Sequence, residues 1–483
     1  MMQIADRVQR IAASQSLAMA ARAKAMKAAG IDVISMSLGE PDMDTPEHIR
    51  RAAQEAIDNH WSHYGPVAGI PSLREAIAAA QNAQEERLSG SAIRGLGVRF
   101  EAEDVIVSVG AKMAIYNAIQ TMINPGDEVV IPMPSWVSYT EMVKVAGGEV
   151  VAVQTKYENR YCLTPKELRA ALTEKTRMLI LCCPNNPTGS VYGYEELKAI
   201  VAVLREYPQV VVLSDEIYNA LVYSDEENKN NKNTAYADIN IDKKNTHSTP
   251  AMSDGPRGLE RNHPQALTSE LAAPVDANTP NLLPDEQHVE CLQKCVVPPC
   301  ENDKNIVCSM AFFAEIADRL IIVNGVSKAY AMTGWRIGWL MSKDKAFIGA
   351  CTRLQGQQMT CATMVAQKAA EAALTGSQEC VEQMRQVFAE RRELICRLAA
   401  EIPGFRFEKP QGAFYLFPDV SALGGGDKIA EYLLEEAHVA VVSGSAFGCP
   451  ECIRLSYAIS TEEIAEAMRR IQVAITRIVN KQK

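Results

Sequence analysis

The sequence predicts an α/β fold in which a mostly parallel sheet is sandwiched by helices and followed by a smaller α+β domain. Two observations lead to this fold class. Between about residues 100 and 340, short runs rich in Val, Ile and Leu alternate with segments of helical periodicity. Such runs are typical of parallel strands that are buried on both faces. From about residue 345 the pattern changes to long helical segments and short strands, which indicates the second unit.

The N-terminal segment, residues 1–45, is predicted to pack with the smaller domain. Residues 16–29 have helical spacing, and a glycine follows them. Residues 31–42 read as a short strand that leads into a turn. Both elements precede the regular alternation of strands and helices.

The large domain is predicted over residues 46–340. Its first helix covers residues 45–57, with Thr45 as the N-cap and Pro46 at the first helical position. A strand followed by a turn or loop then recurs five times. These repeats cover residues 104–123, 127–139, 177–189, 210–221 and 319–330.

A polar segment over residues 224–309 interrupts this alternation. It is rich in Asn, Asp, Pro and Thr and poor in aromatic residues, so it cannot bury enough apolar surface to offset chain entropy. We interpret it as a disordered or loop-like insertion. Four cysteines gather near its end, where a metal knuckle and a plain insertion with incidental thiols are both open: Cys291, Cys295, Cys300 and Cys308.

The smaller domain is predicted over residues 345–483. Its helices are expected at residues 353–374, 378–401 and 461–480. Short strands are expected within residues 404–417, 439–444 and 452–459. Helices and strands that are not arranged in a repeating order favour an α+β unit.

Composition and charge exclude several classes of partner. The 483 residues carry a net charge of −10, which argues against nucleic acid and anionic membranes as main partners. No apolar run approaches the roughly 18 residues that span a bilayer, and the N-terminus lacks the apolar core of a secretion signal. We therefore expect a cytoplasmic protein with reduced thiols. The Cys-Pro-Glu-Cys stretch at 449–452 has redox or zinc spacing, but no second pair or nearby histidine supports a metal site, so none is predicted.

Chemically distinctive side chains follow the predicted strands. They are Gly110, Ala111 and Lys112, then Trp136, Asn186, Asp215 with Tyr218, and finally Lys328 with Arg336. In open α/β sheets the carboxyl ends of the strands form the ligand site. The set combines a phosphate-sized turn, a flat aromatic ring, a buried carboxylate, a lysine and an arginine. A phosphorylated, charged aromatic heterocycle with an aldehyde group, pyridoxal 5'-phosphate, requires all of these groups together.

With these residues the chain resembles the fold-type I, class I aminotransferases of the aspartate aminotransferase group. The resemblance covers residues 1–223 and 310–483. It rests on the combination of the motifs SLGEPDMDTP, YGPVAGIPSLREAI, PSWVSY, PNNPTG, SDEIY, SKAYAMTGWRIG and IRLSYA. It implies a seven-stranded, mostly parallel sheet and pyridoxal 5'-phosphate as cofactor.

The resemblance implies catalytic roles for three residues. Lys328 forms the Schiff base with the cofactor and then carries the proton of the substrate, for which its amine has to be neutral. Asp215 pairs with the protonated pyridine nitrogen, because a buried carboxylate demands a cation. Tyr218, together with Asn186, donates to the phenolic oxygen of the cofactor. From the residues alone, Asp215 could also be a helix N-cap, and the NNPTG stretch could be a simple turn.

The remaining cofactor contacts are implied in the same way. Trp136 stacks on the ring, although an aromatic residue after a strand is often only part of the packing. The backbone amides of Gly110, Ala111 and Lys112 at a helix start bind the phosphate, with the charge of Arg336 and help from Ser327. Many relatives have a hydroxyl residue three positions before the lysine, where this chain has a glycine.

Substrate binding and a homodimer follow from the same resemblance. Arg454 matches the arginine that binds the α-carboxylate of the substrate, and Gly39 lets the backbone approach that substrate. Tyr64 matches a tyrosine that reaches the phosphate of the neighbouring subunit. The resemblance therefore implies a homodimer with active sites at the subunit interface.

The substrate class depends mainly on Lys112, whose counterpart often meets the distal carboxylate of aspartate or glutamate. Trp136 and Asn186 are also expected to contact the substrate. The expected reaction is L-aspartate + 2-oxoglutarate = oxaloacetate + L-glutamate, by a ping-pong mechanism. Relatives that use prephenate or arogenate often carry Lys-Pro-Ser near the N-terminus, where residues 12–14 of this chain are Ala-Ala-Ser.

Two kinds of alternative stay open at this point. The same fold supports aminotransfer from aromatic amino acids, alanine or kynurenine, and carbon–sulfur lyase chemistry. A non-catalytic binding protein could also keep the fold, but such proteins usually lose the lysine or the carboxylate, and Lys328 and Asp215 are both present.

Overall fold

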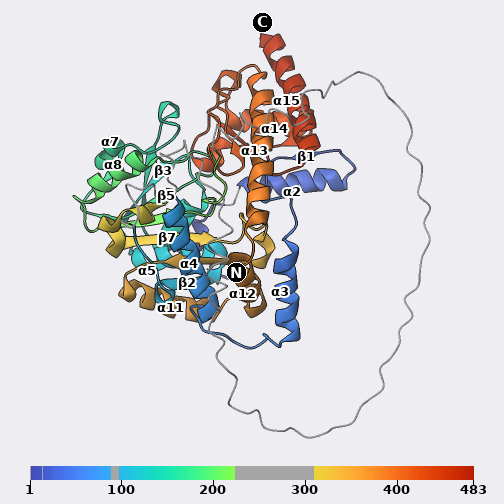
Figure 1. Cartoon of the computed structure of the whole chain (residues 1–483). Coiled ribbons are helices and arrows are strands. Elements are labelled where there is room, and N and C mark those ends of the chain that lie inside the picture. Colours follow the sequence, from blue (N-terminus) through green and yellow to red (C-terminus); the bar gives the residue numbers. More distant parts are fainter. Residues whose placement is uncertain (1, 13–14, 89–96, 224–308, 483) are drawn as a thin grey trace, which may run out of the picture.

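A seven-stranded sheet forms the centre of the larger unit in the computed structural model, which describes residues 2–12, 15–88, 97–223 and 309–482 (Figure 1). The strand order is β2-β8-β7-β6-β5-β3-β4, and β8 runs antiparallel to both of its neighbours. The strands are β2 (Val105–Val109), β3 (Glu128–Met133), β4 (Glu149–Gln154), β5 (Thr176–Cys182), β6 (Val211–Asp215), β7 (Leu320–Gly325) and β8 (Ile337–Met341). The predicted fold class, a mostly parallel sheet between helices, is confirmed.

Helices cover both faces of this sheet because alternate strand residues point to opposite sides. Val105 and Val107 belong to one buried cluster, whereas Ile106 between them belongs to the other. The first face carries α3 (Glu47–Asp58), α4 (Pro71–Leu88), α7 (Pro165–Ala171), α8 (Tyr194–Leu204) and α12 (Met364–Thr375). The second carries α5 (Gly110–Met122), α6 (Ser138–Ala146) and α11 (Lys345–Gln358).

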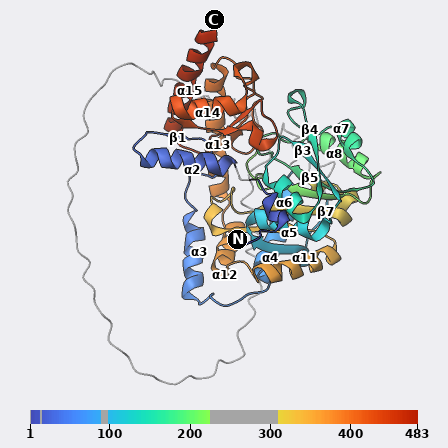
Figure 2. The ribbon, with the colours of Figure 1, turned by 180° about the vertical axis from the view of Figure 1, so that it is seen from behind.

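A third buried cluster forms the core of the smaller unit, at the end of the molecule that holds the C-terminus (Figures 1 and 2). Its antiparallel sheet has the order β11-β12-β9, made of β11 (Val442–Ser443), β12 (Ile453–Ser456) and β9 (Tyr415–Leu416). The helices are α13 (Glu379–Ala400), α14 (Gly426–Glu436) and α15 (Thr461–Gln482). Among the residues described, no helix is both long and apolar enough to cross a membrane.

The N-terminal segment contacts both units. β1 (Ile34–Ser35) pairs in parallel with β10 (Val439–Ala440) of the smaller unit, and α2 (Gln15–Ala28) packs beside that pair. In contrast, α1 (Asp6–Gln9) lies against α6 of the larger unit, where the Glu141 carboxylate accepts a hydrogen bond from the Ala12 amide.

The helix predicted over residues 353–374 is wrong, because the chain forms two helices there. α11 ends at Gln358, α12 begins at Met364, and Thr360 between them has a left-handed φ of 64°. Both helices pack in the two clusters that flank the large sheet, whereas the sequence assigned everything from residue 345 to the smaller domain. We propose that the smaller unit begins with α13, which contacts the large-sheet cluster at its first turn and the smaller cluster from Met384 onward.

The expected N-cap at Thr45 is also wrong. α3 begins at Glu47, and its N-cap is Pro46. The Thr45 hydroxyl instead donates to the Ala331 carbonyl at 2.7 Å and accepts from the Trp335 indole nitrogen at 3.0 Å. A capping hydroxyl has to turn back onto its own helix, and these long-range bonds turn it away.

The polar segment 224–309 and its four cysteines fall outside the described residues, except for Ser309.

Candidate active site

The carboxyl ends of the central strands place the predicted catalytic residues at one edge of the large sheet. β6 ends at Asp215, which pairs in register with Val323 of the parallel strand β7. β7 ends at Gly325, three residues before Lys328. α5 begins at Gly110, directly after β2. Lys328 and Asp215 therefore follow neighbouring strands of the same sheet.

Lys328 is half-buried, and its ammonium group is held by a backbone carbonyl. Nζ donates to the Gly39 oxygen at 2.5 Å and lies 5.9 Å from the centre of the Tyr218 ring. Burial lowers the pKa of Lys328 to about 8, and the charges of Arg454 and Arg336 act in the same direction. A lysine with this pKa has an appreciable neutral fraction near pH 8, which an attacking or proton-accepting amine needs.

Asp215 is buried and has one strong hydrogen-bond partner. Its Oδ2 accepts from the Tyr139 hydroxyl at 2.6 Å, and its Oδ1 accepts from the Ile217 amide at 3.2 Å. Burial raises the pKa of Asp215 to about 6, while these hydrogen bonds and the charge of Lys328 oppose the rise. The carboxylate is thus ionised at neutral pH only at a considerable desolvation cost, which a cation placed against it would offset.

Sequence reasoning missed Tyr139. This residue lies three positions after Trp136 in the PSWVSY motif, and their rings meet edge to face with centres 5.4 Å apart. A spacing of three residues indicates that the two side chains share a face. It does not indicate the partner of the Tyr139 hydroxyl, because Asp215 lies on a strand distant in the sequence. Tyr139 is therefore the residue that orients the buried carboxylate.

We expect Tyr139→Phe to shift the pH dependence of any reaction that needs the Asp215 carboxylate ionised. The hydrogen bond from Tyr139 lowers the pKa of Asp215, so its loss raises that pKa. Activity that needs the carboxylate ionised falls as the pH drops through this pKa. For a rise of one pKa unit the acid limb of the kcat profile should therefore move to higher pH by about one unit, so that kcat falls about tenfold near pH 5 and only about twofold near pH 7. An unmoved acid limb would contradict this role.

A glycine turn and an arginine form the second part of the site. Gly110 has a φ of +76°, and a Cβ added there would lie 2.4 Å from the Arg336 guanidinium. Gly338 of β8 is equally constrained, since a Cβ there would lie 2.3 Å from the Ala111 amide nitrogen. The first amides of the 13-residue helix α5, which no side chain caps, thus lie next to a guanidinium, as an anion site requires.

Lys112 lies on the first turn of α5 beside Trp136. Its Nζ is 4.6 Å from the centre of the Trp136 indole. Burial lowers the pKa of Lys112, and the charge of Arg336 lowers it further. Neighbouring cations of this kind favour the binding of an anion between them.

Arg454 lies on β12 of the smaller sheet, and its guanidinium is buried. Nη1 donates to the Asn186 side-chain oxygen at 2.9 Å and Nη2 to the Ser37 carbonyl at 2.7 Å. Nε has no partner, and within the described chain no carboxylate forms an ion pair with this arginine. A buried guanidinium that meets only neutral acceptors is suited to a carboxylate ligand.

Tyr415 is a second residue that sequence reasoning missed. Its hydroxyl lies 2.7 Å from that of Tyr218, and its ring is 4.5 Å from the Arg454 guanidinium. A Cβ added at Gly39 would lie 2.1 Å from the Tyr415 hydroxyl, so only glycine fits there. No local pattern marks Tyr415, because all of these contacts are long-range.

The structure therefore brings the predicted residues together in two groups. Hydrogen bonds and ring contacts connect Gly39, Asn186, Tyr218, Lys328 and Arg454 through Tyr415. Close packing connects Gly110, Ala111, Lys112, Trp136 and Arg336, and Tyr139 joins Asp215 to Trp136 of this second group. The electrostatic interaction of Asp215 with Lys328 links the two groups. Ser327 is buried just after β7, and none of these contacts includes it.

Known proteins are similar to this chain over nearly its whole length. The family model described as Aminotransferase class I and II matches residues 31–248 and 282–471. The aspartate aminotransferase of Geobacillus stearothermophilus is 37% identical over 476 residues, which cover 97% of this chain and 98% of that protein. The chain belongs to the class I and II aminotransferases.

Two further members of this aminotransferase family are similar over nearly their whole length. A probable aspartate/prephenate aminotransferase of Rhizobium leguminosarum is 35% identical, with 97% of this chain and 98% of that protein covered. The structure of Thermus thermophilus aspartate aminotransferase with maleate matches with a TM-score of 0.74 and 32% identity, covering 98% of this chain and all of that chain.

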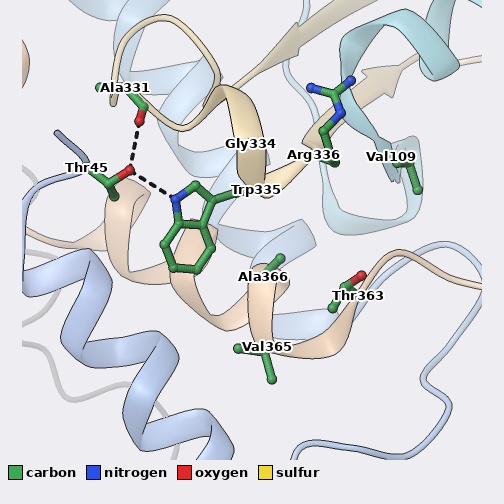
Figure 3. A pocket seen from close by; sticks show the side chains of 9 residues that line it. All are labelled: Thr45, Val109, Ala331, Gly334, Trp335, Arg336, Thr363, Val365 and Ala366. Atoms are coloured by element: carbon green, nitrogen blue, oxygen red, sulfur yellow. Dashed lines mark hydrogen bonds between the residues drawn. The ribbon is translucent and has the colours of Figure 1, made fainter. Parts of the chain in front are cut away.

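In this aminotransferase a cavity of about 560 Å³ opens beside Arg336 (Figure 3). In the view of Figure 3, the Arg336 guanidinium points away from the Trp335 indole, which lies over α12 and is held by Thr45. The cavity lining includes Val109 and Arg336 but not Lys328.

Tyr64 is 90% exposed and, in the described part of the chain, takes no part in either group of site residues.

Proposed function

We propose that this protein is a pyridoxal 5'-phosphate-dependent aminotransferase that interconverts L-aspartate and 2-oxoglutarate with oxaloacetate and L-glutamate. The observation that carries the proposal is the pairing of Lys328, whose pKa is lowered to about 8, with a buried Asp215 at the ends of neighbouring strands. The names of the relatives support the same substrates.

The residues present fit the cofactor. Gly110 leaves room for the Arg336 guanidinium, and together with Ala111 they form a place for a phosphate. Ser327 follows the end of β7 by two residues. Asp215 lacks a bonded cation, which the ring nitrogen would supply. We assign the ring face to Trp136 and the phenolic oxygen to Asn186 and Tyr218. When bound, the cofactor supplies an aldehyde carbon and a cationic ring that withdraws electrons from the breaking C–H bond.

The chain's own residues would position the substrate and move its proton. Arg454 binds the α-carboxylate as a planar fork, and its buried setting keeps competing water out. Lys328 accepts the proton from the substrate Cα and returns it to the cofactor side, a task for which its lowered pKa is suited. Gly39 gives the amine of Lys328 a carbonyl partner before the substrate arrives.

Lys112 would determine the preference for acidic amino acids. It lies beside Trp136, and its pKa is lowered by burial and by Arg336. We propose that its ammonium pairs with the distal carboxylate of aspartate or glutamate. Trp136 and Asn186 would bound the space for the rest of the substrate.

We expect Lys112→Ala to reduce kcat/KM for aspartate by about 10²-fold, the typical loss when one partner of a partly buried charge pair is removed. The value for alanine, which has no distal carboxylate, should change by no more than about twofold. Lys112→Arg, which keeps the charge, is the matched control and should retain most of the aspartate preference. Equal losses with both donors would overturn this assignment.

A panel of donors and acceptors tests the reaction itself. Aspartate and glutamate should be turned over in preference to alanine, aromatic amino acids and kynurenine. Prephenate should be a poor acceptor, because residues 12–14 are Ala-Ala-Ser. A clear preference for an aromatic donor would replace the proposed substrate pair.

We further propose a cytoplasmic homodimer. Tyr64 is 90% exposed, although tyrosine usually covers part of its ring in the fold, and a second copy would provide that cover. In such a dimer Tyr64 would reach the phosphate site of the partner near Arg336. Light scattering on the holoenzyme should give twice the mass of the chain.

A further inference from the structure

Two cysteines in the smaller unit lie in sulfur–sulfur contact. Cys449 and Cys452 close a tight turn in which the Cys452 amide donates to the Cys449 carbonyl at 3.1 Å, and their Sγ atoms are 3.3 Å apart. A disulfide bond measures about 2.05 Å, so a displacement of about 1 Å joins them. Cys449 is half-exposed and Cys452 is buried, which leaves one sulfur accessible to a small reagent.

The surroundings divide the two thiols into a donor and an acceptor. Cys449 donates to Cys452, and the Tyr161 hydroxyl lies 3.5 Å from the Cys452 sulfur. The contact with Cys449 lowers the pKa of Cys452, and the same contact raises that of Cys449. Negative charge on this pair therefore rests mainly on Cys452. Across the described residues no group of three or more His, Cys, Asp or Glu side chains could hold a metal ion, so thiol chemistry is the simpler use of the pair.

The pair is connected directly to the substrate arginine. Cys452 precedes β12, and Arg454 is two residues further along the chain. The Gly444 amide donates to the Cys452 carbonyl at 2.7 Å, and the Cys449 amide donates to the Gly444 carbonyl at 2.9 Å. These bonds close a loop over residues 444–452.

The same loop contacts the large unit. The Phe447 ring lies 4.9 Å from the Arg454 guanidinium. The Phe447 carbonyl accepts from the Ser135 amide at 3.0 Å, next to Trp136. The loop thus contacts the Arg454 guanidinium of the smaller unit and also the backbone next to Trp136 of the larger unit.

We propose that Cys449 and Cys452 form a redox-sensitive dithiol, and that its oxidation to a disulfide weakens carboxylate binding at Arg454. The second half of this proposal rests on the role given to Arg454 in the proposed function. The oxidant is a low-molecular-weight disulfide, RSSR.

The exchange takes two steps. Cys449, after passing its proton across the contact to Cys452, attacks one sulfur of RSSR and releases one RS⁻. Cys452 then attacks the Cys449 sulfur and expels the second RS⁻. One S–S bond forms in the protein and one is lost in the reagent, and the single proton of the thiol–thiolate pair leaves Cys452 for one released sulfur, so the products are the protein disulfide, RSH and RS⁻.

Closing the bond draws Cys449 toward Cys452 and moves the loop that carries Phe447. A misplacement of about 1 Å in a binding constellation can cost up to about 10²-fold in rate. We expect a smaller loss, a rise of about tenfold in the Kd of maleate and in the KM for aspartate, because only the surroundings of Arg454 shift. Dithiothreitol should reverse it.

The test uses the purified holoenzyme, incubated with oxidised glutathione and digested under non-reducing conditions. Peptide mass spectrometry should find residues 449–452 linked, with the loss of two hydrogen atoms, and should separate this pair from the cysteines at 291–308. Calorimetry with maleate measures binding without turnover. A peptide that stays reduced, or a disulfide that leaves the Kd of maleate unchanged, would overturn the proposal.

Two variants provide the controls. Cys449→Ser removes the accessible thiol, so the basal activity should stay unchanged and oxidised glutathione should have no effect on maleate binding. Cys380→Ser removes another half-exposed cysteine, on α13, and should leave the response intact. A response that persists in Cys449→Ser places the sensitive thiol elsewhere. If the linked peptide forms and maleate binding weakens while no donor is transaminated, the proposed function fails and the dithiol stands.

Discussion

Replacing Lys328 with alanine is expected to lower kcat by at least about 10⁴-fold, the upper range for the loss of a general acid–base group. The variant should also release the cofactor more readily, because the proposed function makes Lys328 its covalent anchor. The structural reason is that Nζ lies 2.5 Å from the Gly39 carbonyl and 5.9 and 6.0 Å from the centres of the Tyr218 and Phe414 rings, and the proposed function makes it the amine that reacts with the substrate. The measurement is steady-state transamination together with the visible absorbance of the bound cofactor.

Lys328→Arg separates the proton-transfer role from a purely electrostatic one. Arginine keeps the positive charge but is not deprotonated in proteins, so it cannot serve as a base. We expect it to be about as inactive as the alanine variant. If Lys328→Arg kept more than about a tenth of the activity, the lysine would act through its charge, and the proposed proton transfer would be wrong. Lys198→Ala, an exposed lysine on α8, controls for general effects of losing a lysine.

Asp215→Asn has the second largest expected effect, a fall in kcat of about 10²–10³-fold, comparable to the loss of one preorganised electrostatic contact. Asparagine has nearly the same shape and can still accept a hydrogen bond from Tyr139, so the fold should be kept. What is lost is the negative charge that, in the proposed function, pairs with the ring nitrogen. The measurement is kcat for aspartate, with circular dichroism to verify the fold.

The neighbouring residue gives a matched control for this variant. Glu216 is also fully buried, and its Oε1 accepts from the Ser214 hydroxyl at 2.9 Å and the Met310 amide at 3.2 Å. Burial raises the pKa of Glu216 to about 8, so it is largely neutral at pH 7. Glu216→Gln therefore removes little charge, and kcat should stay within about threefold of the parent. Equal losses in the two variants would show that packing rather than charge is responsible.

The residues that could be predicted from the sequence are those at the ends of buried strands. Asp215 ends one apolar run and Lys328 lies five residues after another, and the pairing of β6 with β7 places both at the same edge of the sheet. Arg454 lies within β12 of the other sheet and could be assigned only from its motif. Its hydrogen bond to Asn186 joins residues far apart in the sequence, so no local pattern predicts it. Tyr139 and Tyr415 were not predicted, because the function of each depends on a hydroxyl partner far away in the chain.

The errors in the predicted elements have a similar origin. The break between α11 and α12 falls where Thr360 takes a left-handed φ without a glycine or proline to announce it. Thr45 has the right position for an N-cap but bonds to Ala331 and Trp335 instead. In both cases local propensity pointed one way and tertiary contacts prevailed.

One short connection has a consequence for how the enzyme distinguishes its substrates. The stretch from Ser37 to Gly39 joins β1 to α3, and its carbonyls hold Arg454 of one sheet and Lys328 of the other. In the proposed function, the α-carboxylate of an amino acid binds Arg454 and its amine displaces Lys328. Such a substrate contacts both units, and its binding free energy can favour the arrangement of the units in which the reaction occurs. An amine without the α-carboxylate engages only one of them, so it should be penalised in turnover more than in affinity.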